Sequence, residues 1–237
     1  MNVTVAIVSY NVAPLLERCL HTVRQALREC GSGSIVVVDN ASSDGSAQMV
    51  EAAFPEAHLI RNEQNRGFGV ACNQALPLAR DAILFLNPDA ELQPGALPAL
   101  LRTLQDRPNA ALVGPKLEYP DGREQPARRR FPPLSTLLVE STPLQWRLGQ
   151  WLPLSRYYCR DLPEVAGRVD WLSGACLLGR ARALKQVGGF NPIYFMYFEE
   201  LDLAQRLASY GWETWYEPQA RVIHHHSQSA DQNVQAK

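Results

Sequence analysis

Apolar runs of strand length alternate with amphipathic segments along the first half of the chain. Runs that are apolar throughout are typical of strands buried on both faces, as in a parallel sheet covered by helices. The predicted strands are residues 3–9, 34–39, 58–61 and 82–86. Apolar residues at helical spacing predict helices at residues 12–29, 44–53, 69–79 and 95–107, with Ser42 and Ser43 as caps of the second helix. This order indicates an α/β fold, a Rossmann-like βαβ series with a central, mainly parallel sheet flanked by helices.

The second half of the chain has a different pattern. Residues 114–168 are rich in Pro, Arg and Trp, and their apolar content is too low for a separate core, so we expect an insertion or lid there. A strand at residues 175–179, helices at 181–187 and 199–210 and a last strand at 213–216 follow. We therefore expect a single domain over residues 1–237, divided into 1–113, the insertion 114–168, a C-terminal region 169–230 and a tail 231–237.

The composition is that of an ordinary globular protein. The 237 residues are 46% hydrophobic and 20% charged, with a formal net charge of -1. This charge argues against a nucleic-acid-binding protein, which needs a basic face for the phosphates. The five cysteines lack a Cys-x-x-Cys pair and are expected to be free thiols in a reducing compartment. No signal peptide and no membrane-spanning run is recognised, so we expect a cytoplasmic protein, with attachment to a membrane surface left open.

Polar residues follow three of the predicted strands, at the edge where open α/β sheets bind ligands. The three segments are Ser9-Tyr10-Asn11, the run that begins with Asp39 and Asn40, and Asn87-Pro88-Asp89. Turn chemistry alone explains such residues at any one strand end. Their coincidence at three strand ends favours a ligand site, in which Asp39 could accept hydrogen bonds from a ribose or a base.

Asn87 and Asp89 place two oxygen-bearing side chains two residues apart. Hard cations such as Mg²⁺ and Mn²⁺ take oxygen ligands and often share them with substrate phosphates. One amide and one carboxylate need a further ligand, for which a histidine of the run His224-His225-His226 is a candidate; a solvated histidine run is the alternative. Residues 65–69 resemble a phosphate-binding glycine loop only loosely, because their spacing is not Gly-x-Gly-x-x-Gly.

Acidic residues begin the predicted helix at 199–210, directly after a run of large aromatic residues. The acids are Glu199, Glu200 and Asp202. Acids at a helix N-terminus are favoured by the macrodipole, which offers a purely structural explanation. Aromatic side chains that exclude water beside a carboxylate also maintain the pKa that a general base needs. The residues themselves leave both interpretations open.

Taken together and in this order, the segments resemble a family 2 glycosyltransferase of the GT-A fold. The resemblance extends from Val3 to about Ser229, nearly the whole chain. The motifs that carry it are Val-Ala-Ile-Val-Ser-Tyr-Asn at 5–11, Val-Val-Asp-Asn-Ala-Ser-Ser-Asp-Gly-Ser at 37–46, Asn-Arg-Gly-Phe-Gly at 65–69 with Asn73, Leu-Asn-Pro-Asp at 86–89, Trp-Leu-Ser-Gly-Ala-Cys at 171–176, Gly-Gly-Phe at 188–190, Glu-Glu-Leu-Asp-Leu at 199–203, and His224. Residues 121–130, with Gln125 and three arginines, further resemble the bacterial rhamnosyltransferase-like branch that builds cell-surface polysaccharides.

The resemblance implies roles for individual residues. It implies that Glu200, or its neighbour Glu199, is the catalytic base, and that Asp89 and His224 bind Mg²⁺ or Mn²⁺ against the donor diphosphate. Asn87 stands where the family's first metal-binding acid would be. The residues implied to bind the nucleotide sugar, mostly in the half 1–113, are Ser9, Tyr10, Asn11, Asp39, Asn40, Asn65, Gly67, Asn87 and Asp89. The residues implied to bind the acceptor, in the half 169–230, are Trp171, Gly174 and Ala175, with a core position as the alternative for Trp171.

The implied reaction is an inverting displacement, in which an acceptor hydroxyl attacks the anomeric carbon of a nucleoside-diphosphate sugar. The expected donor is dTDP- or UDP-linked, with rhamnose as the first guess. The expected acceptor is a saccharide or a polyprenyl-linked saccharide, in cell-surface polysaccharide synthesis. Arg128, Arg129 and Arg130 could bind a diphosphate or form a solvated patch. Residues 134–158 mix Leu, Trp and Arg and could meet a membrane interface or act as a lid.

Two other functions fit part of the pattern. A nucleotidyltransferase shares the nucleotide-binding α/β half, but it usually carries a glycine-rich, basic signature after the first strand, where this chain has Tyr10-Asn11-Val12-Ala13. A non-catalytic nucleotide-sugar-binding partner protein is the other alternative. Such a protein need not retain both the acidic pair and the metal ligands, and this chain has both.

Overall fold

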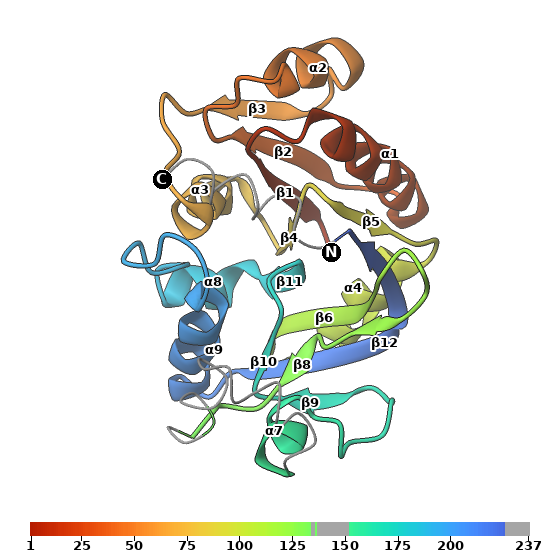
Figure 1. Cartoon of the computed structure of the whole chain (residues 1–237), viewed down its shortest axis with the longest axis vertical. Coiled ribbons are helices and arrows are strands. Elements are labelled where there is room, and N and C mark those ends of the chain that lie inside the picture. Colours follow the sequence, from red (N-terminus) through yellow and green to blue (C-terminus); the bar gives the residue numbers. More distant parts are fainter. Residues whose placement is uncertain (134–135, 137–151, 226–237) are drawn as a thin grey trace.

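The computed structural model describes residues 1–133, 136 and 152–225 (Figure 1). Its N-terminal half is a βαβ series around a parallel sheet, in which the strands pair in the order β3-β2-β1-β4. The elements are β1 (Val3–Ser9), α1 (Ala13–Cys30), β2 (Ser34–Asp39), α2 (Ser46–Ala53), β3 (His58–Arg61), α3 (Phe68–Ala75), the 3-10 helix η1 (Leu76–Leu78) and β4 (Ala82–Leu86). The four strands predicted here have the predicted bounds.

The C-terminal half extends this sheet with strands of mixed direction. Strand β11 pairs antiparallel with β4 and β6, and β12 pairs parallel with β6 and antiparallel with β5. The elements are β5 (Ala90–Leu92), α4 (Ala96–Asp106), β6 (Ala110–Glu118), β7 (Glu124–Gln125), β8 (Arg128–Arg129), α7 (Leu152–Tyr157), β9 (Gly167–Val169), β10 (Trp171–Leu172), β11 (Cys176–Arg180), α8 (Ala181–Gln186), α9 (Glu199–Ser209) and β12 (Glu213–His224). The main path of the sheet is β3-β2-β1-β4-β11-β6-β12-β5.

Several strands of the C-terminal half differ from the sequence-based expectation, among them β6 and β12. The sequence predicts no strand over β6, because Gly114 and Pro115 interrupt its apolar pattern, and this strand runs across the boundary predicted at residue 113. The sequence also predicts that β12 ends at residue 216, whereas the strand continues to His224. A shift of register between Glu217 and Arg221 carries β12 past a proline and lets the pairing with β6 resume. This continuation determines where His224 lies.

Each face of the sheet is covered by its own helices. Alternate residues of β1 point to opposite faces. Val5 and Ile7 belong to a core cluster with α1 and α4, whereas Ala6 and Val8 belong to a second cluster with α3, α8 and α9. Burial on both faces explains why the central strands are apolar throughout. Within the described residues, no helix combines the length and the apolar character that crossing a membrane requires.

Hydrogen bonds join the loops that follow β1 and β2. The predicted capping of α2 is wrong. Ser42 and Ser43 do not cap this helix, whose N-cap residue is Gly45 at φ 88°. Ser42 Oγ instead accepts a hydrogen bond from the backbone N–H of Asn11 at 3.0 Å. Asp44 accepts one from the backbone N–H of the first residue of α1 at 2.8 Å. The polar residues of this turn therefore hold two strand ends side by side.

The side chain of Asn73 joins α3 to the segment that precedes α9. Its Nδ2 donates to the carbonyl O of Phe190 at 2.7 Å, and its Oδ1 accepts from the N–H of Phe190 at 2.8 Å. Phe190 is buried, and Gly189 before it has φ 73°. A Cβ on Gly189 would lie 2.3 Å from Asn73 Oδ1, so only glycine fits there. Asn73 thus pairs with both backbone polar groups of Phe190 and holds in place the segment that leads to α9.

We expect Asn73→Ala to lower the free energy of unfolding by about 2–4 kcal/mol, because it leaves the N–H and C=O of Phe190 without partners. Gln74→Ala is the matched control on the same helix, since the amide of Gln74 pairs with another side chain, that of Asn62. Its loss should stay below about 1 kcal/mol. Urea unfolding followed by circular dichroism measures both variants. Equal losses in the two variants would contradict this role of Asn73.

Candidate active site

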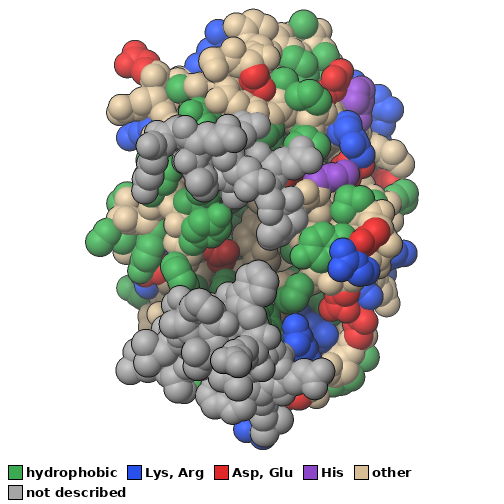
Figure 2. Space-filling view, viewed as in Figure 1, with side chains coloured by type: hydrophobic (Ala, Val, Ile, Leu, Met, Phe, Trp, Pro, Cys, Tyr) green, Lys and Arg blue, Asp and Glu red, His purple; other side chains and the backbone are tan. Residues whose placement is uncertain are grey.

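A cavity of about 390 Å³ lies between the carboxyl ends of the parallel strands and the start of α9. Figure 2 shows acidic atoms recessed between hydrophobic side chains near the middle of this face. The predicted site residues that line the cavity are Tyr10, Asn40, Asn65, Gly67, Asn87, Asp89, Gly174, Ala175, Glu199, Glu200 and His224. The fold therefore brings together, around one cavity, site residues that were predicted in separate segments of the sequence.

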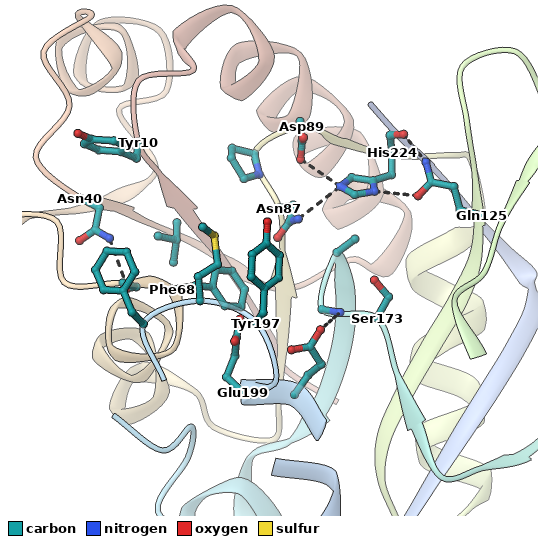
Figure 3. Close-up of a pocket in the computed structure, with 18 of the residues that line it drawn as sticks. Tyr10, Asn40, Phe68, Asn87, Asp89, Gln125, Ser173, Tyr197, Glu199 and His224 are labelled. Carbon is teal, nitrogen blue, oxygen red and sulfur yellow. Dashed lines mark hydrogen bonds and ion pairs between the residues drawn. The ribbon is translucent and has the colours of Figure 1, made fainter. Parts of the chain in front are cut away.

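Strand pairing brings Asp89 and His224 together at one end of the cavity. The antiparallel pair β5–β12 sets Ala90 opposite His224, and the N–H of His225 donates to the carbonyl O of Asp89 at 2.9 Å. His224 Nε2 lies 3.3 Å from Asp89 Oδ1 and 3.4 Å from Asn87 Nδ2. Figure 3 shows these three side chains pointing toward one another. We call Asn87, Asp89 and His224 the cation end of the cavity.

The cation end has donor atoms that suit a divalent cation. Asp89 Oδ1 is buried and has no hydrogen-bond partner among the described residues, which is unfavourable until a positive charge compensates it. Carboxylate and amide oxygens are the ligands that Mg²⁺ and Mn²⁺ prefer. In the described part of the chain, no third His, Cys, Asp or Glu completes a cluster with Asp89 and His224. A cation held here would therefore take further ligands from Asn87, water or a substrate diphosphate.

Asparagine amides shape the wall of the cavity that follows β2. Asn40 Nδ2 donates to Asn65 Oδ1 at 2.8 Å, and Asn40 Oδ1 accepts from the N–H of Arg66 at 3.1 Å. Asn65 Oδ1 also accepts from the N–H of Gly67 at 3.0 Å. Figure 3 shows Asn40 and Tyr10 on the side of the cavity that the N-terminal half forms. Asn40 and Asn65 thus build this loop as well as lining the cavity.

Four predicted site residues do not line the cavity: Ser9, Asn11, Asp39 and Trp171. Asp39 is buried, and its Oδ2 accepts a hydrogen bond from the N–H of Ser42 at 3.1 Å. Ser9 Oγ and Asp39 Oδ1 are buried without hydrogen-bond partners among the described residues. Trp171 is buried in the second core cluster, and its Nε1 donates to the carbonyl O of Arg130 at 3.0 Å. This position agrees with the core alternative for Trp171.

Two carboxylates, Glu199 and Glu200, enter the cavity from the start of α9. Phe198, directly before them, has φ 68°, so the chain turns sharply into the helix. Glu200 Oε1 accepts a hydrogen bond from the N–H of Gly174 at 3.3 Å. The Oε2 atoms of both glutamates are buried and have no hydrogen-bond partners among the described residues. In Figure 3, Glu199 lies at the opposite end of the cavity from Asp89.

Burial raises the pKa of both carboxyl groups. For Glu199, burial acts together with repulsion from Glu200 and raises the pKa to about 7. Burial also raises the pKa of Glu200, while backbone N–H groups and the guanidinium of Arg129 oppose the rise. A carboxylate with a raised pKa is a stronger base than an exposed glutamate, so either residue can accept a proton near neutral pH.

An aromatic loop, residues 195–198, borders the cavity beside these carboxylates. Phe195, Met196 and Tyr197 line the cavity, and Tyr197 has φ 71°. The carbonyl O of Phe195 accepts a hydrogen bond from the N–H of Phe68 at 3.0 Å. A Cβ on Gly67 would lie 2.5 Å from that same oxygen, and Gly67 has φ 80°. Glycine at this position therefore lets the loop after β3 meet the aromatic loop.

The three consecutive arginines have three different environments. Arg128 is buried and donates to a backbone carbonyl at 2.9 Å. Arg130 forms an ion pair with Asp161 at 2.9 Å. Arg129 alone of the three lines the cavity, and its guanidinium carbon lies 4.9 Å from the ring centroid of Trp171. The sequence signal, a basic triplet, could not distinguish these environments.

Several residues of the cavity wall were not predicted as site residues. They are Val8, Phe68, Pro88, Tyr119, Gln125, Pro126, Ser173, Phe195, Met196 and Tyr197, whereas Arg129 belongs to the basic triplet for which the sequence left diphosphate binding open. The aromatic residues before the acidic pair gave a signal in the sequence, because they suggested the exclusion of water. Gln125 gave none beyond the family resemblance, because its strand β7 has only two residues and no periodic pattern.

The raised pKa of Glu199 makes stability depend on pH. The folded state favours the protonated carboxyl, so its contribution is fully present below the ordinary value of 4.5 and is lost as the pH rises to about 7. Between these pH values, this carboxyl should lower the free energy of unfolding of the wild type by an amount on the order of 3 kcal/mol, and we expect Glu199→Gln to remove this decrease. Urea unfolding across this range measures the difference, with the exposed Glu63→Gln as the control. Parallel stability curves for wild type and Glu199→Gln would contradict this assignment.

Solved structures of other proteins share the fold. They include the mannosyltransferase PcManGT from Pyrobaculum calidifontis, in complex with GDP-Man and Mn²⁺, and GalNAc-T7 with UDP, GalNAc and Mn²⁺, at TM-scores of 0.65 and 0.70 and identities of 19% and 17%. The similarity covers 95% and 94% of this chain, and 57% and 44% of those chains, so this chain spans about half of their length. At such identities the similarity shows the fold alone, and the prediction of a GT-A fold is confirmed.

Relatives with more similar sequences include rhamnosyltransferases. N-acetylglucosaminyl-diphospho-decaprenol L-rhamnosyltransferase of Mycobacterium tuberculosis is 34% identical over 241 residues, which cover 95% of this chain and 76% of the relative. Rhamnosyltransferase WbbL of Escherichia coli K12 is 30% identical over 153 residues, which cover 63% of this chain and 54% of that protein. The family model described as "Glycosyl transferase family 2" matches residues 4–187. The prediction of a glycosyltransferase is thereby confirmed, and the chain belongs to glycosyl transferase family 2.

Proposed function

We propose that the protein transfers a sugar, with rhamnose as the first candidate, from a dTDP- or UDP-linked donor to a saccharide carried on a polyprenyl diphosphate. The observation that carries the proposal is a single cavity with Asp89 and His224 at one end and the pair Glu199 and Glu200 at the other. Glycosyl transfer needs a group that stabilises the negative charge of the leaving diphosphate and a base that accepts the proton of the attacking hydroxyl. The name of the Mycobacterium tuberculosis relative supports the choice of rhamnose and of a lipid-linked acceptor.

In this proposal Glu200 removes the proton from the acceptor hydroxyl. The hydroxyl oxygen forms a bond to the anomeric carbon, the bond from that carbon to the diphosphate oxygen breaks, and the nucleoside diphosphate leaves. The configuration at the anomeric carbon is inverted. The N–H of Gly174 holds Oε1 of Glu200, which leaves the unpartnered Oε2 to accept the proton. Glu199, with a pKa of about 7, is the alternative base.

The cation end would hold Mg²⁺ or Mn²⁺ through Asp89 and His224, with Asn87 beside them. When bound, such a cation stabilises the negative charge of the departing diphosphate as a Lewis acid. The backbone bond from His225 to Asp89 and the strand pair β5–β12 keep the ligands in place. Mn²⁺ in the solved structures of the same fold supports a divalent cation.

Arg129 is the residue that we expect to bind the diphosphate of the acceptor. Its guanidinium carbon lies 4.9 Å from the ring centroid of Trp171 and 5.4 Å from that of Tyr158, so aromatic faces support the planar group. One edge donates to the carbonyl O of Pro126 at 3.0 Å. A guanidinium supported on its face presents its N–H groups in the plane, which suits phosphate oxygens. Arg129 lines the same cavity as Glu200, so an acceptor bound at Arg129 would lie close to the proposed base.

A polyprenyl-linked acceptor would bring the protein to a membrane surface. Large apolar side chains around the aromatic loop are exposed, namely Ile193, Phe195, Tyr197 and Phe198. Phe195 and Tyr197 also line the cavity, so this surface continues into the site. Exposed aromatic side chains suit the interfacial region of a bilayer. Most of residues 134–158, for which the sequence predicts a membrane interface or a lid, lies outside the described residues.

The test is a transfer assay with dTDP-rhamnose and UDP-linked sugars as donors and a polyprenyl-diphosphate-linked N-acetylglucosamine as acceptor. We expect one donor to give a product with the added mass of its sugar, and NMR of that product to show the inverted anomeric configuration. Donor binding without transfer or hydrolysis for any donor would favour the alternative of a non-catalytic nucleotide-sugar-binding partner.

We expect Glu200→Gln to lower kcat by about 10²–10⁴-fold, because the amide cannot accept the proton of the hydroxyl. Donor affinity, measured by calorimetry, should remain within about twofold, since Glu200 acts at the other end of the cavity. Glu199→Gln is the isosteric comparison and should cost much less. If Glu199→Gln abolishes turnover and Glu200→Gln does not, Glu199 is the base.

We expect Arg129→Ala to raise the KM for a diphosphate-linked acceptor by about 10–100-fold, the effect of losing a charge-assisted hydrogen bond. Arg130→Ala is the matched control, because Arg130 is paired with Asp161. An acceptor that carries the same saccharide without the diphosphate should lose no affinity with Arg129→Ala. Equal losses of affinity for both acceptors would indicate that Arg129 acts through the base Glu200 instead. A loss of donor affinity would indicate that Arg129 binds the donor diphosphate.

A further inference from the structure

Gln125 makes a two-point contact with His224. Its Nε2 donates to the carbonyl O of His224 at 2.7 Å, and its Oε1 lies 2.9 Å from His224 Nδ1. Both side chains are buried, with Gln125 4% exposed and His224 7% exposed. Strand β7 pairs with β6, and β6 pairs with β12, so the sheet itself sets this contact. Figure 3 shows the amide of Gln125 against the edge of the imidazole that faces away from Asp89.

This contact fixes which nitrogen of His224 carries the proton. A carbonyl oxygen only accepts hydrogen bonds, so the NH₂ group of Gln125 must face the carbonyl of His224, and Oε1 must face Nδ1. Because Oε1 also only accepts, Nδ1 must carry a proton. In the neutral imidazole the lone pair then lies on Nε2, the nitrogen that points toward Asn87 and Asp89.

The same tautomer accounts for the unpartnered oxygen of Asp89. Without a proton, His224 Nε2 cannot donate to Asp89 Oδ1, although the two atoms lie 3.3 Å apart. The oxygen is accordingly buried without a hydrogen-bond partner among the described residues. Asn87 Nδ2, at 3.4 Å, can donate to Nε2 but leaves the carboxylate unsatisfied. Two electron-pair donors therefore face each other, an arrangement that a cation between them would stabilise.

We propose that Gln125 is a positioning residue, which holds His224 in the Nδ1–H tautomer and so keeps Nε2 available as a cation ligand. Glutamine suits this position because a side chain of this length must offer one acceptor, for Nδ1–H, and one donor, for the carbonyl of His224. The assignment of the tautomer stands on the contacts alone. The ligand role of Nε2 rests on the proposed function.

The tautomer can be measured directly by long-range ¹H–¹⁵N NMR of the histidine rings in cation-free protein, with His224→Ala to assign the signals. We expect Nδ1–H in the wild type and in Glu124→Gln, the control on the exposed neighbouring position of β7. Gln125→Met keeps the shape but removes the acceptor and the donor, so the ring should shift toward Nε2–H and donate to Asp89. Gln125→Glu keeps an acceptor for Nδ1 and should retain the Nδ1–H form.

Mn²⁺ titration in the presence of UDP or dTDP, followed by electron paramagnetic resonance, supplies the second readout. We expect Gln125→Met to weaken Mn²⁺ binding by about 10–100-fold and Gln125→Glu by less, because supporting residues of this kind typically have such effects. Nε2–H in the wild type, or an unchanged tautomer and affinity in Gln125→Met, would overturn the proposal. A wild type with Nδ1–H that binds no Mn²⁺ would overturn the ligand role, and with it the proposed cation end, but not the tautomer assignment.

Discussion

The pairing of β5 with β12 is the interaction on which the site depends. Strand β5 has only three residues, yet its antiparallel register sets Ala90 opposite His224 and so brings Asp89 to the imidazole. On the other side of β12, β6 carries β7 and with it Gln125. Side chains held on paired strands are positioned more accurately than side chains on loops. The chemistry of the cation end therefore follows from the register of four strands, and a shift of one residue in β12 would turn His224 away from the cavity.

The site is built from groups and backbone conformations that cost free energy in the folded protein. Oxygens of Asp89, Glu199 and Glu200 are buried without hydrogen-bond partners among the described residues, and each such atom costs about 1–3 kcal/mol. Tyr197 and Phe198 have positive φ, a conformation that costs about 1–3 kcal/mol for such residues. The sheet, covered on both faces by helices, supplies the stability that tolerates these costs. A cation and a substrate hydroxyl would satisfy the same oxygens, so the costs favour binding.

The sequence predicts the parallel half of the fold well, because strands such as β2 are buried on both faces and are apolar throughout. It misses β6 and the end of β12, where Pro115 and Pro218 interrupt the pattern while the pairing continues past them. Most of the predicted site residues meet in the cavity, since they come from motifs at strand ends. Gln125 could not be predicted, because its role depends on a contact across three strands and not on its neighbours in the chain. Likewise, only tertiary structure separates Arg129 from the arginines on either side of it.

Calorimetry with a panel of nucleotide sugars, with and without Mn²⁺, on the wild type and on Asp89→Ala tests the role of Asp89 and His224 most directly. We expect one donor to bind the wild type tightly only when Mn²⁺ is present, and we expect Asp89→Ala to lose this dependence on Mn²⁺ while keeping the fold. That result would also identify the sugar and the nucleotide. Two results would contradict the proposal that the donor diphosphate binds at the cation end of the cavity. One is donor binding that is equally strong without Mn²⁺, and the other is donor binding that keeps its full Mn²⁺ dependence in Asp89→Ala.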